Sequence, residues 1–501
     1  MNYLLGLDIG TSGVKAVLVS AEGELIATET SSYPLSSPKD GWVEQNPEDW
    51  WESTAEVINK IITKSNIASK NLKGISLSGQ MHSSVFLDKK RQVIRPAILW
   101  SDTRTSQQCK DIYNKVGGFE NLIKYVSNPA LEGFTAPKII WLQKNEPKNY
   151  KKVDIVLLPK DYIRYRLTGE IGTEVSDAAG TLLFNVDKKK WSEKLLKQLN
   201  IDSSILPPVY ESIAVTGEVN SYAAEETGLK KGIPVVAGGA DNACGAAGSG
   251  VMKEGRVMVS IGSSGVVLAP INSPEADKQG RIHLFNHTRP DSWYMMGVML
   301  SAGMSYSWLQ EKMYGDHLDY TKLDNLAKKV STGSNGLLFL PYLFGERTPH
   351  ADSNARGVFF GISNEHSEGH FARSVMEGVA FGLRDSLELI KGKGVEIEEV
   401  RAIGGGAKSK IWQRILADVF GTEILLLEVE EGPAFGAALI AGVGVGLFSD
   451  FEEVEKNIIS IKDRVFPVKE NTKCYDEYYQ IYRRLYTSLE KDFKTLSQIR
   501  S

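Results

Sequence analysis

Two short glycine turns carry the residues best suited to phosphate chemistry. Residues 7–14 (LDIGTSGV) and residues 259–266 (VSIGSSGV) align without a gap, and each is an apolar run broken by glycine and hydroxyl residues. Such a sequence predicts two strands joined by a tight turn whose backbone N–H groups and hydroxyls can bind phosphate. The candidate ligands of a nucleotide's phosphates are therefore Thr11, Ser12, Gly262, Ser263 and Ser264.

The two turns differ at the position that could bind a metal. Asp8 stands in the first copy where Ser260 stands in the second. Mg²⁺ prefers oxygen ligands and usually keeps several waters. This asymmetry favours a single MgATP held between two similar halves of the chain, with Asp8 binding Mg²⁺ directly or through water. Asp8 is thus a candidate metal ligand and a candidate catalytic residue.

A second carboxylate, Asp241, follows the apolar run 235–237 and lies within the glycine-rich segment 238–250. A carboxylate at the end of a strand can reach into a cleft and accept a proton from a substrate hydroxyl. We therefore assign Asp241 as a candidate general base and expect Asn242 to contact the same substrate. The alternative is a helix cap, a common role of Asp. The position of Asp241 just before the second turn favours catalysis.

A cluster of polar and large apolar residues follows the run 75–77. Residues 78–83 (SGQMHS) and 99–104 (LWSDTR) combine hydrogen-bonding groups with apolar faces, a mixture suited to binding a polyhydroxylated molecule. Taken singly, the histidine could be a satisfied core residue, and the aspartate could cap a helix beginning near Thr103. Taken together, they predict a sugar site with the candidate ligands Gln80, Met81, His82, Trp100 and Asp102.

A triple glycine stands between a predicted strand and a predicted helix at residues 401–412 (RAIGGGAKSKIW). Glycines allow close approach to the backbone, and a helix N-terminus favours a phosphate or a ribose–adenine unit. The alternative is an ordinary strand-to-helix connection, and residues 432–436, which open the apolar helix 437–441, are similarly ambiguous. The candidate ATP ligands in the triple-glycine segment are Gly405, Gly406 and Lys408.

Other catalytic motifs are missing from the sequence. The chain has no Walker loop, no Rossmann fingerprint, no H-E-x-x-H, no C-x-x-C and no G-x-S-x-G. Its 58 basic and 62 acidic residues give a net charge of −4, which makes nucleic acid an unlikely partner. The three cysteines are far apart, and no apolar stretch is long enough to span a membrane. These features predict a cytoplasmic protein with no membrane partner.

The chain of 501 residues is too long for one hydrophobic core and suits two domains. Strand-like runs alternate with longer helical patterns such as 47–64 and 370–390, which predicts α/β layers. We place the domain junction, and a possible hinge, in the glycine-rich segment, so that the domains are 1–245 and 246–501. Aromatic residues at helical spacing over 475–496 favour a terminal helix docked on the protein over a helix on a membrane surface.

Taken together, these motifs resemble those of a known family, the FGGY family of carbohydrate kinases, and the resemblance extends over residues 3–448. One family signature is present at residues 133–145, and the other begins at 357–362 and continues to 370–377. Residues 80–82 (QMH), 160–169 and 176–180 are similar to the branch of the family that acts on xylulose, although Ser83 stands where many members of that branch have glycine.

The resemblance implies an α/β fold of two domains built like actin and other ribonuclease H-like ATPases, with a catalytic cleft between the domains. It implies ATP and Mg²⁺ as cofactors, a sugar held mostly by the N-terminal domain, and ATP held mostly by the C-terminal domain. Asp241 becomes the base, Asp8 lies near Mg²⁺, Thr11 and the turn 262–265 hold phosphates, and Gly405 and Gly406 belong to the nucleotide site. The family also implies a homodimer.

The implied reaction is transfer of the γ-phosphate of MgATP to the primary hydroxyl of a ketopentose, with D-xylulose giving D-xylulose 5-phosphate. One alternative is another activity of the family, on ribulose, gluconate, glycerol or a deoxy sugar. A second is an ATPase like actin or Hsp70, and a third is a sugar sensor without catalysis. The sugar-binding cluster and the two carboxylates, Asp8 and Asp241, favour the kinase.

Overall fold

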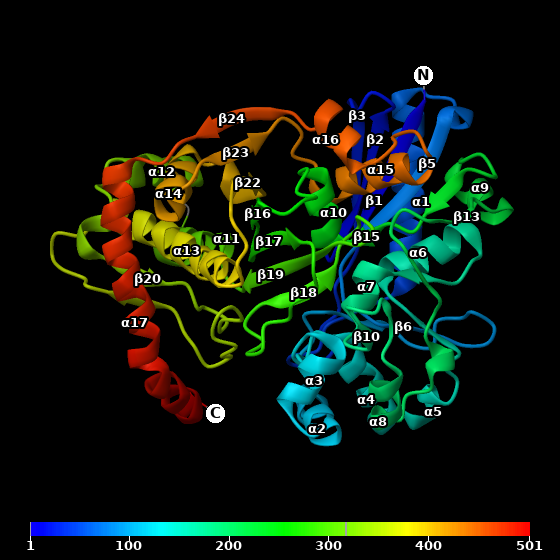
Figure 1. Cartoon of the computed structure of the whole chain (residues 1–501), viewed down its shortest axis with the longest axis horizontal. Coiled ribbons are helices and arrows are strands. Elements are labelled where there is room, and N and C mark those ends of the chain that lie inside the picture. Colours follow the sequence, from blue (N-terminus) through cyan, green and yellow to red (C-terminus); the bar gives the residue numbers. More distant parts are fainter. Residues whose placement is uncertain (1, 316–317, 501) are drawn as a thin grey trace.

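The computed structural model describes residues 2–315 and 318–500, which form two α/β lobes (Figure 1). The sheet of the N-terminal lobe runs in the order β13-β14-β5-β1-β2-β3, with β15 paired to β5. Its strands are β1 (Tyr3–Ile9), β2 (Gly13–Ser20), β3 (Leu25–Ser32), β5 (Leu72–Gly79), β13 (Val215–Glu218), β14 (Pro234–Val236) and β15 (Gly239–Ala240).

The sheet of the C-terminal lobe runs in the order β18-β19-β17-β16-β22-β23-β24. Its strands are β16 (Arg256–Ile261), β17 (Gly265–Ile271), β18 (His283–Asn286), β19 (Trp293–Met299), β22 (Glu399–Ile403), β23 (Ile424–Leu427) and β24 (Ile461–Val465). In each lobe a glycine turn joins an antiparallel pair, β1–β2 or β16–β17, and the first strand of that pair also lies parallel to a later strand. The predicted repetition of two similar halves is confirmed.

Short strand pairs connect the segments outside the two large sheets. They are β4 (Glu44–Gln45) with β7 (Ala97–Ile98), β6 (Val85–Leu87) with β8 (Ile155–Leu157), β9 (Thr173–Glu174) with β12 (Val209–Tyr210), β10 (Phe184–Asn185) with β11 (Lys190–Trp191), and β20 (Leu338–Leu340) with β21 (Val358–Phe360).

Helices cover the sheets as the alternating sequence pattern predicts. Before the middle of the chain they are α1 (Pro47–Ser65), α2 (Ser106–Val116), α3 (Phe119–Val126), α4 (Thr135–Asn145), α5 (Pro147–Tyr150), α6 (Pro159–Thr168), α7 (Val175–Ala179), α8 (Glu193–Leu199) and α9 (Ser221–Thr227). The remaining helices are α10 (Asp241–Gly248), α11 (Gly303–Trp308), α12 (Tyr320–Lys328), α13 (Glu368–Lys391), α14 (Lys410–Phe420), α15 (Gly432–Gly444), α16 (Phe451–Asn457) and α17 (Lys469–Arg500).

The terminal helix α17 lies along the outer side of the C-terminal lobe (Figure 1). Its aromatic stripe is buried, with Tyr475 and Tyr482 fully inaccessible to solvent. The interpretation of this segment as a docked helix is confirmed. Within the described residues, no helix combines the length and the apolar character needed to cross a membrane.

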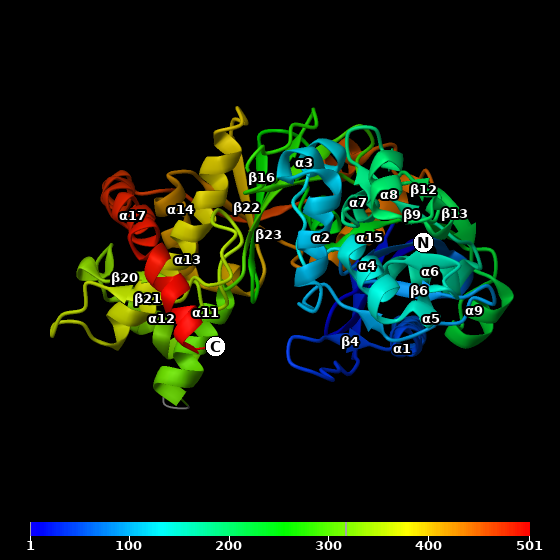
Figure 2. The same cartoon turned by 90° about the horizontal axis from the view of Figure 1, so that it is seen from below.

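The two lobes also touch beside α3, which faces the C-terminal lobe in both views (Figures 1 and 2). Just after α3, the side chain of Asn128 donates a hydrogen bond to the carbonyl of Leu284 in β18, at 2.7 Å, and accepts one from the amide of Leu284. Because Asn128 is fully buried, this pair of bonds fixes one edge of the interface between the lobes.

Helices α10 and α15 cross where the two lobes join. Although α15 comes late in the sequence, it packs on β1, β2 and β5 of the N-terminal lobe as well as on α10. Glycines allow the crossing, because a Cβ atom at Gly436 would lie 1.8 Å from the carbonyl oxygen of Cys244. The proposed division at residue 245 falls within α10 and stays a prediction.

We expect Gly436→Ala to lower the free energy of unfolding by about 1–3 kcal/mol, because the added methyl group forces the two helices apart. Gly245→Ala on α10 is the matched control, since its Cβ would meet nothing nearer than the sulfur of Met258 at 3.6 Å. Urea denaturation of both variants measures the difference. Equal midpoints for Gly436→Ala and the wild type would contradict a close crossing.

Candidate active site

A large cavity in the C-terminal lobe brings together two motifs that are far apart in the sequence. Its volume is about 720 Å³, and the second glycine turn and the triple-glycine segment both line it. Aromatic rings of Tyr306 and Trp412 lie in the same wall. The five predicted ATP ligands that line this cavity are Gly262, Ser263, Gly405, Gly406 and Lys408.

Backbone geometry keeps both glycine segments open. Gly404 has φ of +88°, and a Cβ there would lie 2.8 Å from the carbonyl oxygen of Ile261, so only glycine fits between β16 and β22. In the second turn, the carbonyl of Ser263 accepts hydrogen bonds from Ala302 and Met304, which hold the turn against α11. Within the described part of the chain, the amides of Ser263 and Ser264 donate no hydrogen bond, so both can bind a phosphate oxygen.

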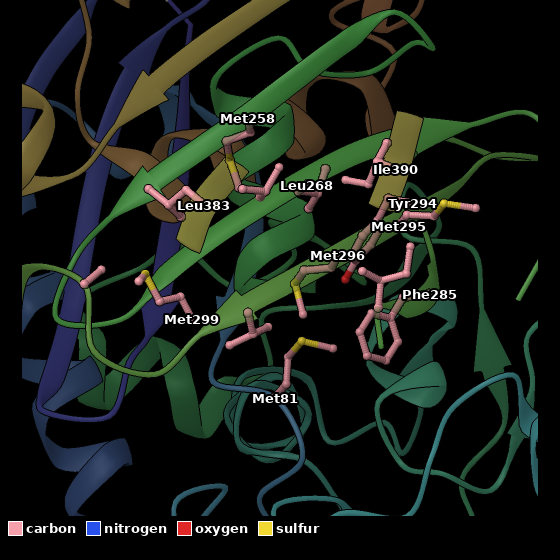
Figure 3. Close-up of a cluster of buried hydrophobic side chains, with 14 of the residues drawn as sticks. Met81, Met258, Leu268, Phe285, Tyr294, Met295, Met296, Met299, Leu383 and Ile390 are labelled. Carbon is pink, nitrogen blue, oxygen red and sulfur yellow. The ribbon is translucent and has the colours of Figure 1, made fainter. Parts of the chain in front are cut away.

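A second cavity, of about 280 Å³, lies between the lobes. Residues of both lobes line it, and in Figure 3 Met81, from the N-terminal lobe, lies beside Met296 of β19. Predicted residues that line this cavity are Met81, His82, Trp100, Asp241, Asn242, Gly262 and Ser264. Gly262 lines both cavities.

His82 is held in a fixed orientation in the wall of this smaller cavity. Its backbone has φ of +70°, an uncommon conformation for histidine, and its carbonyl accepts hydrogen bonds from Thr135 and Lys138. Burial lowers the pKa of His82 to about 3, so the ring is neutral. Its Nδ1 lies 2.6 Å from the carbonyl oxygen of Gly180 and must donate to it. The other nitrogen, Nε2, is then a hydrogen-bond acceptor.

Asp241 is the first residue of α10, at the junction of the lobes. Its Oδ1 accepts hydrogen bonds from the backbone amide of Asn242, at 2.7 Å, and from the side-chain amide of the same residue, at 2.8 Å. Burial, followed by the charge of Asp8, raises the pKa of Asp241 to about 7. One oxygen of the carboxylate is therefore engaged by Asn242, and a pKa of about 7 suits a general base.

A buried network that the motif analysis did not identify supports the backbone before Asp241. The amide of Ala240 donates to Oγ of Ser176 at 2.9 Å, and that hydroxyl donates to Glu174. Glu174 in turn lies 3.4 Å from Nζ of Lys160, and all three side chains are fully buried. In the sequence, the segments 160–169 and 176–180 are notable only for their similarity to the family. Their spacing does not indicate that they form hydrogen bonds with the backbone of residue 240.

Asp8 has the character expected of a ligand to a hard cation. Its Oδ1 is buried and has no hydrogen-bond partner among the described residues, and burial raises the pKa of the carboxyl group. An Mg²⁺ ion would satisfy this oxygen and favour its ionised form. No group of three or more His, Cys, Asp or Glu residues suited to a metal occurs in the described ranges.

The first glycine turn is positioned by the sugar-site residues. The indole nitrogen of Trp100 donates to Oγ1 of Thr11 at 2.9 Å. Thr11 and Ser12, like Asp8, are not among the residues that line the two cavities, but their amides donate no hydrogen bond in the part of the chain that is described. Their assignment as phosphate ligands stays a prediction.

The structure does not bring Gln80 and Asp102 into the cavity between the lobes. Oδ2 of Asp102 accepts hydrogen bonds from the amide of Val43 and from Arg104, both at 2.6 Å, and α2 begins only at Ser106, so Asp102 does not cap it. Gln80 donates to the carbonyl of Gly10 and accepts from Ser83. Both side chains are committed to the walls of the site, and a direct sugar contact stays a prediction for each.

One residue that lines the cavity was missed entirely. Arg347 contributes to the wall formed by the C-terminal lobe. It belongs to the segment 345–350 (GERTPH), whose density of charged residues directly after an apolar strand was the available signal.

The two lobes, with a nucleotide-sized cavity and a smaller cavity that share Gly262 in their linings, fit a two-domain kinase of the actin-like, ribonuclease H-like fold. Profiles of the FGGY family of carbohydrate kinases match residues 3–248 with the N-terminal domain and residues 257–445 with the C-terminal domain. The chain therefore belongs to the FGGY family of carbohydrate kinases, and ATP and a small-molecule sugar are its substrates.

Individual relatives match along nearly the whole chain. The xylulose kinase of Bacillus subtilis is 44% identical over 495 residues, which cover 99% of this chain and 98% of the relative. The solved structure of a xyloylose kinase from Brucella ovis has a TM-score of 0.91 and 34% identity, covering 98% of this chain and 100% of its own. That of a gluconate kinase from Lactobacillus acidophilus has a TM-score of 0.93 and 25% identity, covering 99% of both.

A base with a pKa of about 7 predicts the pH dependence of the reaction. We expect kcat/KM for the sugar to fall about tenfold for each pH unit below 7, because only ionised Asp241 accepts the proton. A steady-state profile from pH 5.5 to 9 measures this limb. Equal values of kcat/KM at pH 5.5 and pH 8 would contradict the role of Asp241 as base.

The same raised pKa predicts an effect on stability. Between the ordinary value of 3.8 and about 7, the folded protein binds a proton that the unfolded chain has lost, so ionisation of Asp241 lowers stability as the pH rises. Asp241→Asn removes that penalty. Its melting temperature should exceed that of the wild type by a few degrees at pH 8, with a smaller excess at pH 5. An equal difference in melting temperature between variant and wild type at both pH values would contradict the raised pKa of Asp241.

Proposed function

We propose that the chain transfers the γ-phosphate of ATP to the primary hydroxyl of D-xylulose and releases D-xylulose 5-phosphate and ADP. The observation that carries the mechanism is that Gly262 of the second glycine turn lines both cavities. A nucleotide in the larger cavity places its terminal phosphate toward the smaller cavity, where Asp241 lies. The identity of the sugar rests on the relatives of nearly equal length that are xylulose kinases.

In the proposed reaction, the primary hydroxyl of the sugar attacks the γ-phosphorus in line with the departing ADP oxygen while Asp241 accepts the hydroxyl proton. Positioning and neutralisation of charge supply most of the rate, because phosphoryl transfer leaves the protein little covalent chemistry. The amides of the two glycine turns hold the phosphates. Neutral His82 accepts a hydrogen bond from a sugar hydroxyl, and Met81 packs against the carbon skeleton.

Mg²⁺ bound near Asp8 would neutralise charge on the phosphates. A hinge near the glycine-rich segment would let the lobes close, expel water and suppress hydrolysis of ATP. Three cysteines without disulfides support the proposal of a cytoplasmic enzyme. The homodimer is proposed only from family membership.

The first test of the proposal is ATP-dependent release of ADP by the wild type with D-xylulose, D-ribulose, L-ribulose, D-gluconate, glycerol and L-fuculose. D-Xylulose should give the highest kcat/KM. A higher value for D-gluconate, the substrate that one structural neighbour is named for, would replace D-xylulose and keep the mechanism. Release of ADP that no sugar changes would overturn the proposal in favour of an ATPase.

Asp241→Ala tests the mechanism with the same assay. Turnover should fall at least about 1,000-fold, since the attacking hydroxyl loses its base and a positioning contact. ATP binding, measured by calorimetry, should stay within about threefold of the wild type because the large cavity is intact. Retention of more than a few per cent of the turnover would remove Asp241 from this role.

A further inference from the structure

Arg347 and His82 both line the sugar-sized cavity, and the two residues come from different lobes. The positive charge of Arg347 is one of the causes that lower the pKa of His82. Met81, His82 and Trp100 form the wall from the N-terminal lobe, whereas Arg347 lies beside Val298 of β19. A molecule in this cavity could therefore contact a cationic side chain that belongs to the C-terminal lobe, the lobe that also contains the nucleotide cavity.

Among the described residues, the guanidinium group of Arg347 makes no hydrogen bond and no ion pair, and only its backbone amide donates, to Glu346. By contrast, the buried Arg104, Arg373 and Arg401 each pair with a carboxylate, whereas the buried Arg164 has two guanidinium nitrogens without a hydrogen-bond partner among the described residues. Arg347 is half-buried and lines the cavity, so its unpaired guanidinium can donate hydrogen bonds to a ligand that accepts them.

The backbone around Arg347 is firmly held, so the side chain is presented from a rigid base. Glu346 on one side accepts hydrogen bonds from the amides of Leu300, at 3.0 Å, and Arg347, at 2.7 Å. Thr348 on the other side exchanges backbone and side-chain hydrogen bonds with Val298, both at 3.0 Å. Such fixation is expected of a residue that recognises part of a ligand, because little entropy is lost on binding.

The hydrogen-bonding groups of the cavity differ in kind. Nε2 of His82 and the carboxylate of Asp241 are acceptors, so they suit hydroxyl groups that donate. A ketone oxygen can only accept, and a guanidinium group presents donors in a rigid fork. Resting on the proposed function, we propose that Arg347 binds the carbonyl oxygen of the open-chain ketose and so selects a ketopentose over a pentitol.

The test compares Arg347→Met, which removes the donors, and Arg347→Lys, which keeps the charge, with the control Arg464→Met on β24. Arg464 is exposed and pairs with Glu423, away from the residues that line the two cavities. For each protein we would measure kcat and KM for D-xylulose, the inhibition constants of xylitol and D-arabitol, and the affinity for ADP.

Arg347→Met should raise the KM for D-xylulose at least about tenfold, as expected for loss of a charged donor, with kcat within about threefold. The inhibition constants of the pentitols should change less than about threefold, and the affinity for ADP should not change. Arg347→Lys should recover part of the loss, and Arg464→Met should match the wild type.

Three results would overturn the inference. One is an unchanged KM in Arg347→Met, and another is equal weakening of D-xylulose and the pentitols, which would indicate a merely structural role. The third is a large fall in kcat at constant KM, which would place Arg347 at the transferred phosphate. Failure of the proposed function is a separate result, because it would appear in the wild type as ADP release that does not depend on D-xylulose.

Discussion

The close crossing of α10 and α15 is the constraint on which the site depends. Two helices can approach so closely only where glycines face each other, and a Cβ atom at Gly436 would overlap the backbone of α10. Helix α15 is at the same time packed on β1 and β5 of the N-terminal lobe. The crossing therefore fixes the position of α10, and with it Asp241 at the first position of that helix, relative to both lobes.

Burial of charge follows from this arrangement and carries a cost. Asp8 and Asp241 both have raised pKa values because the boundary between the lobes excludes water, and the charge of Asp8 acts on Asp241 as well. Arg347, which lines the same cavity as Asp241, forms no ion pair with the described side chains. A site with unpaired groups of both signs is less stable than an apolar one of the same volume, and its ligands relieve that cost on binding. We infer that these charged groups lower the stability of the folded protein and serve selective binding and proton transfer.

Much of the fold could be predicted from the sequence because its signals are local and periodic. Apolar runs beside glycine gave the paired strands at residues 7–14 and 259–266, and the spacing of aromatic residues gave α17. The predicted position of Asp241, after a strand and at the start of a helix, matches the structure, while its role as the base stays a prediction. The sequence predicts side-chain contacts less well where the two contacting residues are distant in the sequence.

The positions that were missed or left open show how far a binding site can be predicted from the sequence. Only the tertiary structure reveals that Ser176 holds the amide of Ala240, or that Arg347 approaches His82. Asp102 is a residue type that often binds sugars, yet its carboxylate accepts its hydrogen bonds from Arg104 and Val43. Residue types identify which groups could bind a sugar, but the direction of each side chain depends on packing between segments that no local pattern encodes.

The most direct test of the central claim is a crystal structure of the protein with D-xylulose and the Mg²⁺ complex of an unhydrolysable ATP analogue. The account predicts the nucleotide in the cavity lined by Gly405 and Trp412, and the primary hydroxyl of the sugar within hydrogen-bond distance of Asp241. The terminal phosphate should lie beside the turn at Gly262. A sugar bound with its primary hydroxyl away from Asp241, or a terminal phosphate remote from both glycine turns, would contradict it.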